Sequence, residues 1–97
     1  MILAKVHKAN DRVVLALCDS ELFGKRYTEE NKQLDLTSEF FKGEPVERDF
    51  LEQLVHGASC ILAIGKEAIA ALVGMGVLQE KETRTIAGIP YAHLVLT

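Results

Sequence analysis

The sequence predicts a single compact α+β domain over residues 1–97, with a mixed β-sheet of about five short strands and two to three helices packed on one face of it. Three observations predict this class. Strand-like segments lie at both ends of the chain, two helical patterns lie between them, and a fully apolar run of strand length precedes the second helix. With 97 residues, of which 48% are hydrophobic and 26% charged, the chain has the length and composition of one globular domain.

The first two strands are predicted from alternation and turn chemistry. The opening segment ILAKVHKA alternates between an apolar face and a face that carries lysine and histidine, as expected of a strand with one wet face. Asn10 and Asp11 then favour a tight turn, because their side chains bond the local backbone and tolerate left-handed conformations. The segment RVVLALC that follows is expected to pair back as a hairpin.

The middle of the chain predicts a loop, a short strand and the first helix. The segment TEENK is expected to be a loop, and QLDLT is expected to be a short third strand. Pro45 is placed as the first residue of a helix, since a proline costs no hydrogen bond at that position. The segment PVERDFLEQLVH carries its apolar residues on one stripe, and Gly57 follows it as a stop signal.

The second half of the chain predicts a buried strand, a buried helix and a last strand. ASCILAI is apolar throughout and has the length of a strand that is covered on both faces. KEAIAALVGMG has small and apolar residues around most of its circumference, so this helix is expected to be largely buried. Gly88 and Pro90 mark a turn, and YAHLVL closes the chain as a strand.

Composition narrows the classes of function. Cys18 and Cys60 lie in apolar runs far apart and match neither a zinc pattern nor a CxxC pair. We therefore expect reduced core thiols in a cytoplasmic protein with no metal and no cofactor. No apolar run approaches the roughly 18 residues of a membrane-spanning helix. The net charge of −3 gives no general attraction for nucleic acid, so RNA binding would need a local basic patch.

Gly65 and Lys66 are the candidate anion-binding residues, because they stand where the buried strand meets the second helix. A helix N-terminus offers unpaired N–H groups and a positive potential. The P-loop pattern is not met, since Glu67 follows Lys66 and no glycine stands five residues before Gly65. P-loop and dinucleotide-binding chemistry are therefore excluded. The two alternatives left are a tight turn with a solvated lysine and a weak anion site.

The nucleic-acid-binding candidates are Lys25, Arg26, Tyr27 and Lys42. The first three follow Gly24 and place two adjacent cations between aromatic residues, and Lys42 follows a phenylalanine pair. Cations that contact phosphates beside rings that stack on bases are typical of proteins that bind single-stranded nucleic acid. The alternative is that the rings are buried and the cations are merely solvated.

His93 is the candidate for acid–base chemistry, because the period of a strand places it on one face with Tyr91. No second acid or nucleophile is linked to it in the sequence. The alternative is a sheet histidine satisfied by a hydrogen bond. The three histidines show no i, i+4 spacing, so no metal site and no catalytic residue is predicted.

Four segments, LALCDSELFGKRY, LDLTSEFFKGE, GKEAIAALVGMGVL and IAGIPYAHLV, follow one another over nearly the whole chain. In their order and spacing the chain resembles the small archaeal family called domain of unknown function 424. The positions that match its glycine-containing motifs and its ending are Gly24, Lys25, Gly43, Glu44, Gly65, Gly88, Pro90 and His93. The resemblance brings no established activity. It implies an archaeal cytosolic protein and associates it with translation.

Three hypotheses of function follow. The first is a non-enzymatic cytosolic accessory protein that binds RNA, a ribosomal subunit or another part of the translation machinery. The second is a protein–protein interaction domain or homodimer that uses an exposed sheet edge or the apolar second helix. The third is a domain or enzyme that binds a small phosphorylated ligand near Gly65, Lys66 and the last strand. Whether the protein is an enzyme stays open at this point.

Overall fold

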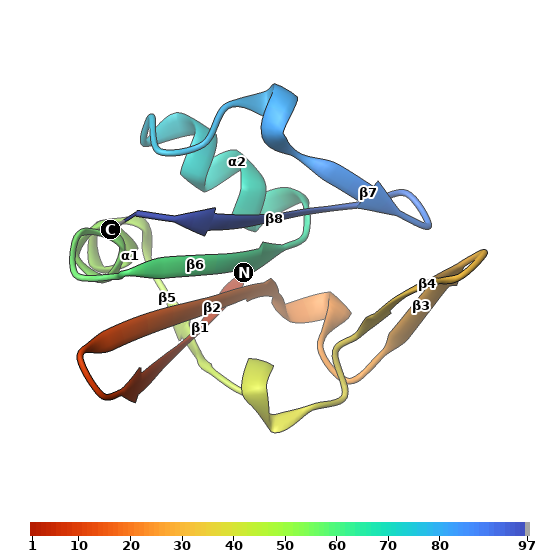
Figure 1. The fold of residues 1–97 in the computed structure, drawn as a ribbon, viewed down its shortest axis with the longest axis horizontal. Helices are drawn as coiled ribbons and strands as arrows, with labels where there is room; N and C mark the ends of the chain where they lie inside the picture. Colours follow the sequence, from red (N-terminus) through yellow and green to blue (C-terminus); the bar gives the residue numbers. More distant parts are fainter. Residues whose placement is uncertain (97) are drawn as a thin grey trace.

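The computed structural model describes residues 1–96, which form eight strands, two α-helices and three short 3-10 helices (Figure 1). In chain order the elements are β1 (Ile2–Ala9), β2 (Arg12–Asp19), η1 (Ser20–Leu22), β3 (Arg26–Glu29), β4 (Lys32–Asp35), η2 (Glu39–Phe41), β5 (Glu44–Val46), α1 (Arg48–His56), β6 (Cys60–Ile64), α2 (Lys66–Gly74), η3 (Glu80–Glu82), β7 (Arg84–Ile86) and β8 (Ile89–Val95).

Six strands form one mixed sheet in the order β5-β1-β2-β6-β8-β7, and β3 and β4 form a separate hairpin. The central neighbours β2 and β6 are parallel, and the other neighbouring pairs are antiparallel. The predicted class is confirmed, since the chain forms a compact α+β domain with a mixed sheet and two α-helices. The sheet has six strands against about five expected, because β5 and β7 were not predicted and the expected strand QLDLT forms β4 in the separate hairpin.

Alternation along the strands gives the sheet two different faces. One face packs against α1 and α2 through aliphatic side chains that include Leu15, Leu17, Ile61, Ala63, Leu94, Leu51, Val55 and Leu72. The opposite face carries a smaller cluster, in which the sheet meets η1, the β3–β4 hairpin and η2 through Ala16, Cys18, Ile64, Leu34, Leu36 and Phe41. Both α-helices therefore lie on one face, as predicted, and the hairpin lies at the far end of the molecule from α1 (Figure 1).

The hairpin of β1 and β2 agrees with the prediction. The two strands pair along their whole length, from Ile2 opposite Asp19 to Ala9 opposite Arg12. Asn10, with φ of 57°, opens the two-residue turn between them. The alternation then places Lys5 and His7 on the face opposite the helices, whereas Lys8 lies on the helix face.

Two local predictions were wrong. The TEENK segment is not a loop, because its start belongs to β3, which turns at Glu30 (φ of 54°) and pairs with β4. The ring of Tyr27 packs against the second cluster, and this burial stabilises β3 although its other residues are polar. Pro45 lies in β5 and does not begin the helix, which starts at Arg48. An edge strand tolerates a proline because one row of its backbone groups needs no partner.

The end of the chain holds a strand that the sequence analysis did not place. Arg84–Ile86 forms β7, which joins β8 through a tight turn at Ala87 and Gly88 with φ of 52° and 78°. Pro90 lies within β8 and not in the turn.

The apolar second helix is used inside the molecule. Its buried residues Ala68, Ile69, Ala71 and Leu72 form part of the main core, so they do not offer a surface to a partner. Cys18 and Cys60 are both free and buried, as predicted. Over residues 1–96, neither helix has the length and apolar character that crossing a membrane requires.

Candidate functional site

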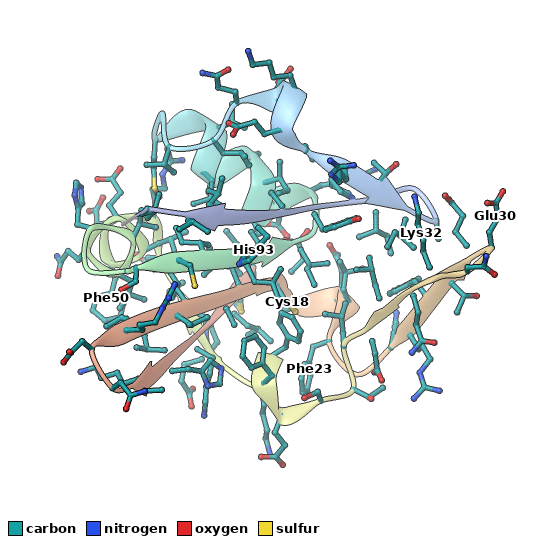
Figure 2. The ribbon with its side chains drawn as sticks, in the orientation of Figure 1. Cys18, Phe23, Glu30, Lys32, Phe50 and His93 are labelled. Atoms are coloured by element: carbon teal, nitrogen blue, oxygen red, sulfur yellow. The ribbon has the colours of Figure 1, made fainter. Side chains whose placement is uncertain are left out.

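One half of the sheet face opposite the helices is left uncovered by the hairpin segment, and we call it the open face. Its exposed or half-buried residues are Lys5, His7, Arg12, Val14, Leu62, His93 and Val95. The cross-strand register aligns Lys5, Ala16, Leu62 and His93 in one row and His7, Val14, Cys60 and Val95 in the next. Three strand spacings therefore separate Lys5 from His93, about 14 Å. Figure 2 shows His93 over the middle of the sheet.

The open face carries charge of one sign. The basic side chains that β1, β2, β6 and β8 place on it are Lys5, His7, Arg12 and His93, and within residues 1–96 these strands place no aspartate or glutamate there. The neighbouring η2 segment adds Glu39 and then Lys42, which offset one another. In a chain of net charge −3, this face is therefore a local basic patch.

His7 and Phe40 join the open face to η2. Their rings are stacked, with centroids 4.2 Å apart and planes that differ by 5°. The Nε2 atom of His7 lies 2.9 Å from the carbonyl oxygen of Phe40. Because a carbonyl only accepts, Nε2 must carry the proton of this hydrogen bond. Phe41 packs edge-on against Phe40 and is itself buried. The stack is thus a flat aromatic platform held in place beside Lys5.

The predicted nucleic-acid residues do not form one patch. Arg26 pairs with Asp35 across the β3–β4 hairpin at 3.4 Å, and Tyr27 is half-buried against the second cluster. Lys25 and Lys42 are exposed, and Lys42 directly follows η2. Lys42 is therefore the member of this group that lies next to the segment that carries the aromatic platform.

The structure explains why glycine occupies two of the motif positions, 24 and 43. Gly24 has φ of +87°, a conformation that glycine adopts without strain. Its N–H donates to the Leu36 carbonyl at 2.8 Å, and this hydrogen bond joins the two chain segments at the base of the β3–β4 hairpin. A Cβ at Gly43 would overlap the carbonyl of Ala4, so only glycine lets this segment approach β1 closely. Glu44, which follows it, pairs opposite Ala4 in β5.

Asp19 occupies the N-terminus of α2. It is the last residue of β2 and is only 2% exposed. Its carboxylate accepts hydrogen bonds from the N–H groups of Glu67 at 3.0 Å and Ala68 at 2.9 Å. Gly65 has φ of +116°, and a Cβ there would overlap that carboxylate. The amides that make a helix start attractive to anions therefore hold the chain's own anion.

The sequence analysis missed Asp19. A signal was present, because a carboxylate ends one central strand and an apolar strand leads straight into a helix. Their proximity depends on the parallel pairing of β2 with β6, which no local pattern predicts.

A cavity of about 200 Å³ next to this cap brings together Gly65, Lys66, Gly88 and Pro90, which the sequence analysis had singled out separately. Its charged lining residues are Asp19, Glu21 and Lys66, and Glu67 lies next to them. Asp19, Glu21 and Glu67 can bring carboxylate oxygens within 4.8 Å of one another, and Glu67 also pairs with the N-terminal ammonium group at 2.8 Å. Like charges repel a phosphate here, so these contacts disfavour a phosphorylated ligand. The anion site at Gly65 and Lys66 stays a prediction.

His93 and Cys18 lie in different environments. His93 is exposed on β8, and its ring has no hydrogen bond to any other group of residues 1–96. Tyr91 shares its face, as predicted, but packs against the second cluster. Burial, and next to it the charge of Asp19, raises the pKa of the Cys18 thiol to about 11. Such a thiol stays protonated and is a poor nucleophile.

Comparisons with known proteins agree with this architecture. The family model described as "Protein of unknown function (DUF424)" matches residues 7–96. A crystal structure of an uncharacterized conserved protein from Methanopyrus kandleri is similar with a TM-score of 0.82 and 27% sequence identity, over 96% of this chain and 89% of that chain. A search of curated proteins gives no match. The similarity therefore supports the fold, and neither protein description states an activity.

Proposed function

We propose that this chain, which belongs to the family of proteins of unknown function DUF424, is a non-enzymatic accessory protein that binds single-stranded RNA on the open face of its sheet. The observation that carries the proposal is the composition of that face, which has the cations Lys5 and Arg12, the imidazole rings of His7 and His93, and no carboxylate from its strands in residues 1–96.

The chemistry of the face suits an unpaired nucleic-acid strand. Ammonium and guanidinium groups at Lys5 and Arg12 contact phosphates, and exposed rings offer surfaces on which bases stack. Here the rings are His93 and the outer surface of the His7–Phe40 stack. Leu62 and Val95 add apolar area between and beside them. A sheet face with stacking rings and basic edges is one of the recurring solutions for single-stranded RNA.

The proposed target is RNA of the translation machinery in the cytoplasm. This part of the proposal draws on the family resemblance, which associates such proteins with translation. It also agrees with a binding role for Lys42, which extends the cations of the open face beyond η2. Lys25 lies at the base of the β3–β4 hairpin and is assigned a peripheral contact.

The direct test is fluorescence anisotropy with a labelled single-stranded RNA of mixed sequence over a range of potassium chloride. If three phosphates are contacted, the affinity falls roughly 20-fold between 50 and 200 mM salt, as expected from counterion release on single strands. The variant carrying Lys5→Glu and Arg12→Glu is expected to lose binding. In sucrose gradients with archaeal ribosomal subunits, the wild-type protein is expected to comigrate with a subunit and this variant is not.

The matched control is Lys32→Glu, because Lys32 lies at the tip of the β3–β4 hairpin, away from the open face (Figure 2). This variant changes the net charge in the same direction and should retain RNA binding. The Lys25→Glu and Arg26→Glu pair tests the patch predicted from sequence. Binding that is absent at 50 mM salt, or that falls equally in the Lys32 variant, contradicts the proposal.

A further inference from the structure

The edge of the sheet beside β1 is only partly paired. β5 pairs with β1 from Ile2 to Ala4 and no further. Ala9 and Arg12 close the two-residue hairpin. In such a closing pair, the N–H of each residue donates to the C=O of the other. Alternation along β1 then turns the N–H and C=O groups of Val6 and Lys8 outward, away from β2. Within residues 1–96, no backbone hydrogen bond outside the regular strand pairs reaches these groups.

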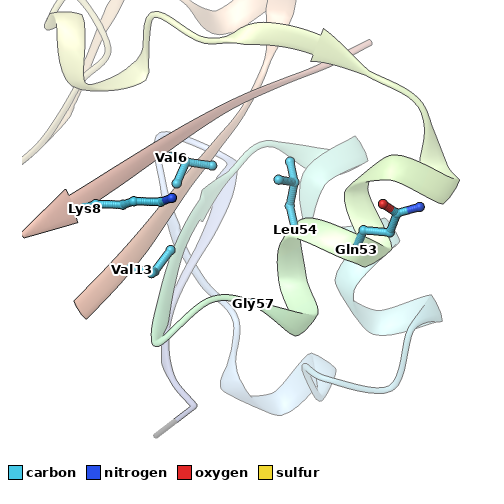
Figure 3. Close-up of a pocket in the computed structure, with 6 residues that line it drawn as sticks. All are labelled: Val6, Lys8, Val13, Gln53, Leu54 and Gly57. Atoms are coloured by element: carbon cyan, nitrogen blue, oxygen red, sulfur yellow. The ribbon is translucent and has the colours of Figure 1, made fainter. Parts of the chain in front are cut away.

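An apolar groove lies directly beside this edge, on the helix face of the sheet. It has a volume of about 620 Å³ and runs between the β1–β2 hairpin and α1 (Figure 3). Its lining consists of Val6, Lys8, Val13, Gln53, Leu54 and Gly57. Val6 is 37% exposed, so this apolar side chain of the groove is partly open to solvent.

Phe50 lies one helical turn before the groove residue Leu54 on α1. It stands four residues before Leu54, so the two side chains lie on the same side of the helix. Phe50 is 53% exposed and lies at the opposite end of the molecule from the β3–β4 hairpin (Figure 2). An unpaired strand edge and an unfilled apolar groove therefore share one border.

We propose that this edge binds an extended segment of a partner protein by β-strand addition, and that the side chains which the segment turns toward the groove are apolar, with one acidic side chain among them opposite Lys8. The outward groups of Val6 and Lys8 supply the main-chain hydrogen bonds. Because side chains alternate between the faces of a strand, every second residue of the added segment points toward the groove. Val6, Val13 and Leu54 there offer apolar contacts.

Charge selects the acidic partner over a second copy of this chain. Lys8 is exposed in the lining of the groove, and it has no carboxylate within salt-bridge distance among residues 1–96. Two copies that paired edge to edge through β1 would bring Lys5 and Lys8 of both β1 strands to one interface. Like charges set opposite one another in this way destabilise a strand pair. A glutamate or aspartate on the groove side of the added strand pairs with Lys8 instead.

The probe for the test is a fluorescein-labelled peptide with the sequence Val-Thr-Glu-Thr-Val, whose valines and glutamate lie on one face of an extended strand. Anisotropy is expected to show binding to the wild-type protein. Amide hydrogen exchange, followed residue by residue by NMR, should slow at least about tenfold at Val6 and Lys8 when the peptide saturates the protein, because the exchanging N–H groups become hydrogen-bonded. The N–H groups of Lys5 and His7 already face β2, so they should change much less.

Two variants and two peptides make the test specific. Lys8→Glu should weaken peptide binding about fivefold through charge reversal, whereas the matched Lys32→Glu variant should bind as the wild type does. Val6→Pro removes an outward N–H that an edge strand can spare, and it should also weaken binding about fivefold. A peptide with lysine in place of glutamate, and one with alternate prolines, should both bind more weakly.

Several results would overturn the proposal. One is the absence of binding at about 1 mM peptide, which is the weak limit of specific recognition. Another is saturation without slower exchange at Val6 and Lys8. A third is slow exchange that appears without peptide and increases with protein concentration, since that result assigns the edge to a second copy. If Val6→Pro fails to fold by circular dichroism, Lys8→Glu and the exchange data decide.

Discussion

Replacing Asp19 with alanine removes the carboxylate that ties the end of β2 to the start of α2. The two hydrogen bonds, 3.0 Å to Glu67 and 2.9 Å to Ala68, are charge-assisted and almost fully shielded from water. A lost helix cap alone costs about 1 kcal/mol. A hydrogen bond to a charged group contributes about 1.5–3 kcal/mol. Because the two bonds share one acceptor group and are not additive, we expect Asp19→Ala to lower the free energy of unfolding by about 3 kcal/mol.

Urea denaturation followed by circular dichroism measures this loss. With a slope of about 1.5 kcal/mol per M, a loss of about 3 kcal/mol moves the midpoint down by about 2 M. The melting temperature should fall by at least about 12 °C for a chain of this length. Asp19→Asn keeps the shape of the side chain and one carbonyl acceptor, so it should lose about half as much free energy.

The control for this prediction is Glu67→Gln. This change removes the carboxylate that pairs with the N-terminal ammonium group but keeps the backbone N–H that Asp19 binds. Both partners of that pair are at least half exposed, so the loss should be much smaller than for Asp19→Ala. A loss of less than about 0.5 kcal/mol for Asp19→Ala, or equal losses for the two variants, would refute the view that the buried cap holds this junction.

Three further predictions follow from local geometry. The pKa of Cys18, raised to about 11 by burial and by Asp19, leaves only about one thousandth of the thiol ionised at pH 8, so a thiol reagent should label it only after unfolding. The pKa of Asp35 lies below its ordinary value, first because of hydrogen bonds from Thr37. The ionised carboxylate therefore stabilises the fold above the ordinary pKa, and this stabilisation is lost as the pH falls through the pKa of the folded state. Asp35→Ala should lower the urea midpoint at pH 7 and not at pH 2. Gly43→Ala should lower the melting temperature far more than Gly24→Ala, because the first Cβ overlaps the backbone of β1 and the second meets open space, despite φ of +87°; equal effects in a thermal melt would contradict this ranking.

The parts of the fold that could be predicted are those whose signal is local. The β1–β2 hairpin has alternation and an Asn-Asp turn, β6 is a short apolar run, and α2 follows it directly. Elements that depend on distant partners were not predictable. β7 forms because β8 pairs with it, and Pro45 joins a strand because β1 offers an edge at Leu3.

The candidate site was only partly predictable for the same reason. His93 and the wet face of β1 were visible from alternation, but their alignment across four strands requires the strand order. The stack of His7 on Phe40 joins residues 33 positions apart. In the same way, the sequence could indicate that Gly65 begins a helix, but not that Asp19 fills that helix end.

The parallel pairing of β2 with β6 also sets the order in which the chain can fold. The β1–β2 hairpin closes over two residues and can form early, whereas joining β2 to β6 brings together Val13 and Ser59, which are 46 residues apart. Closing so long a loop costs chain entropy before any contact compensates for it. The pairing of these two central strands therefore carries a large share of the chain-entropy cost of folding, because it closes the loop that contains the β3–β4 hairpin, β5 and α1.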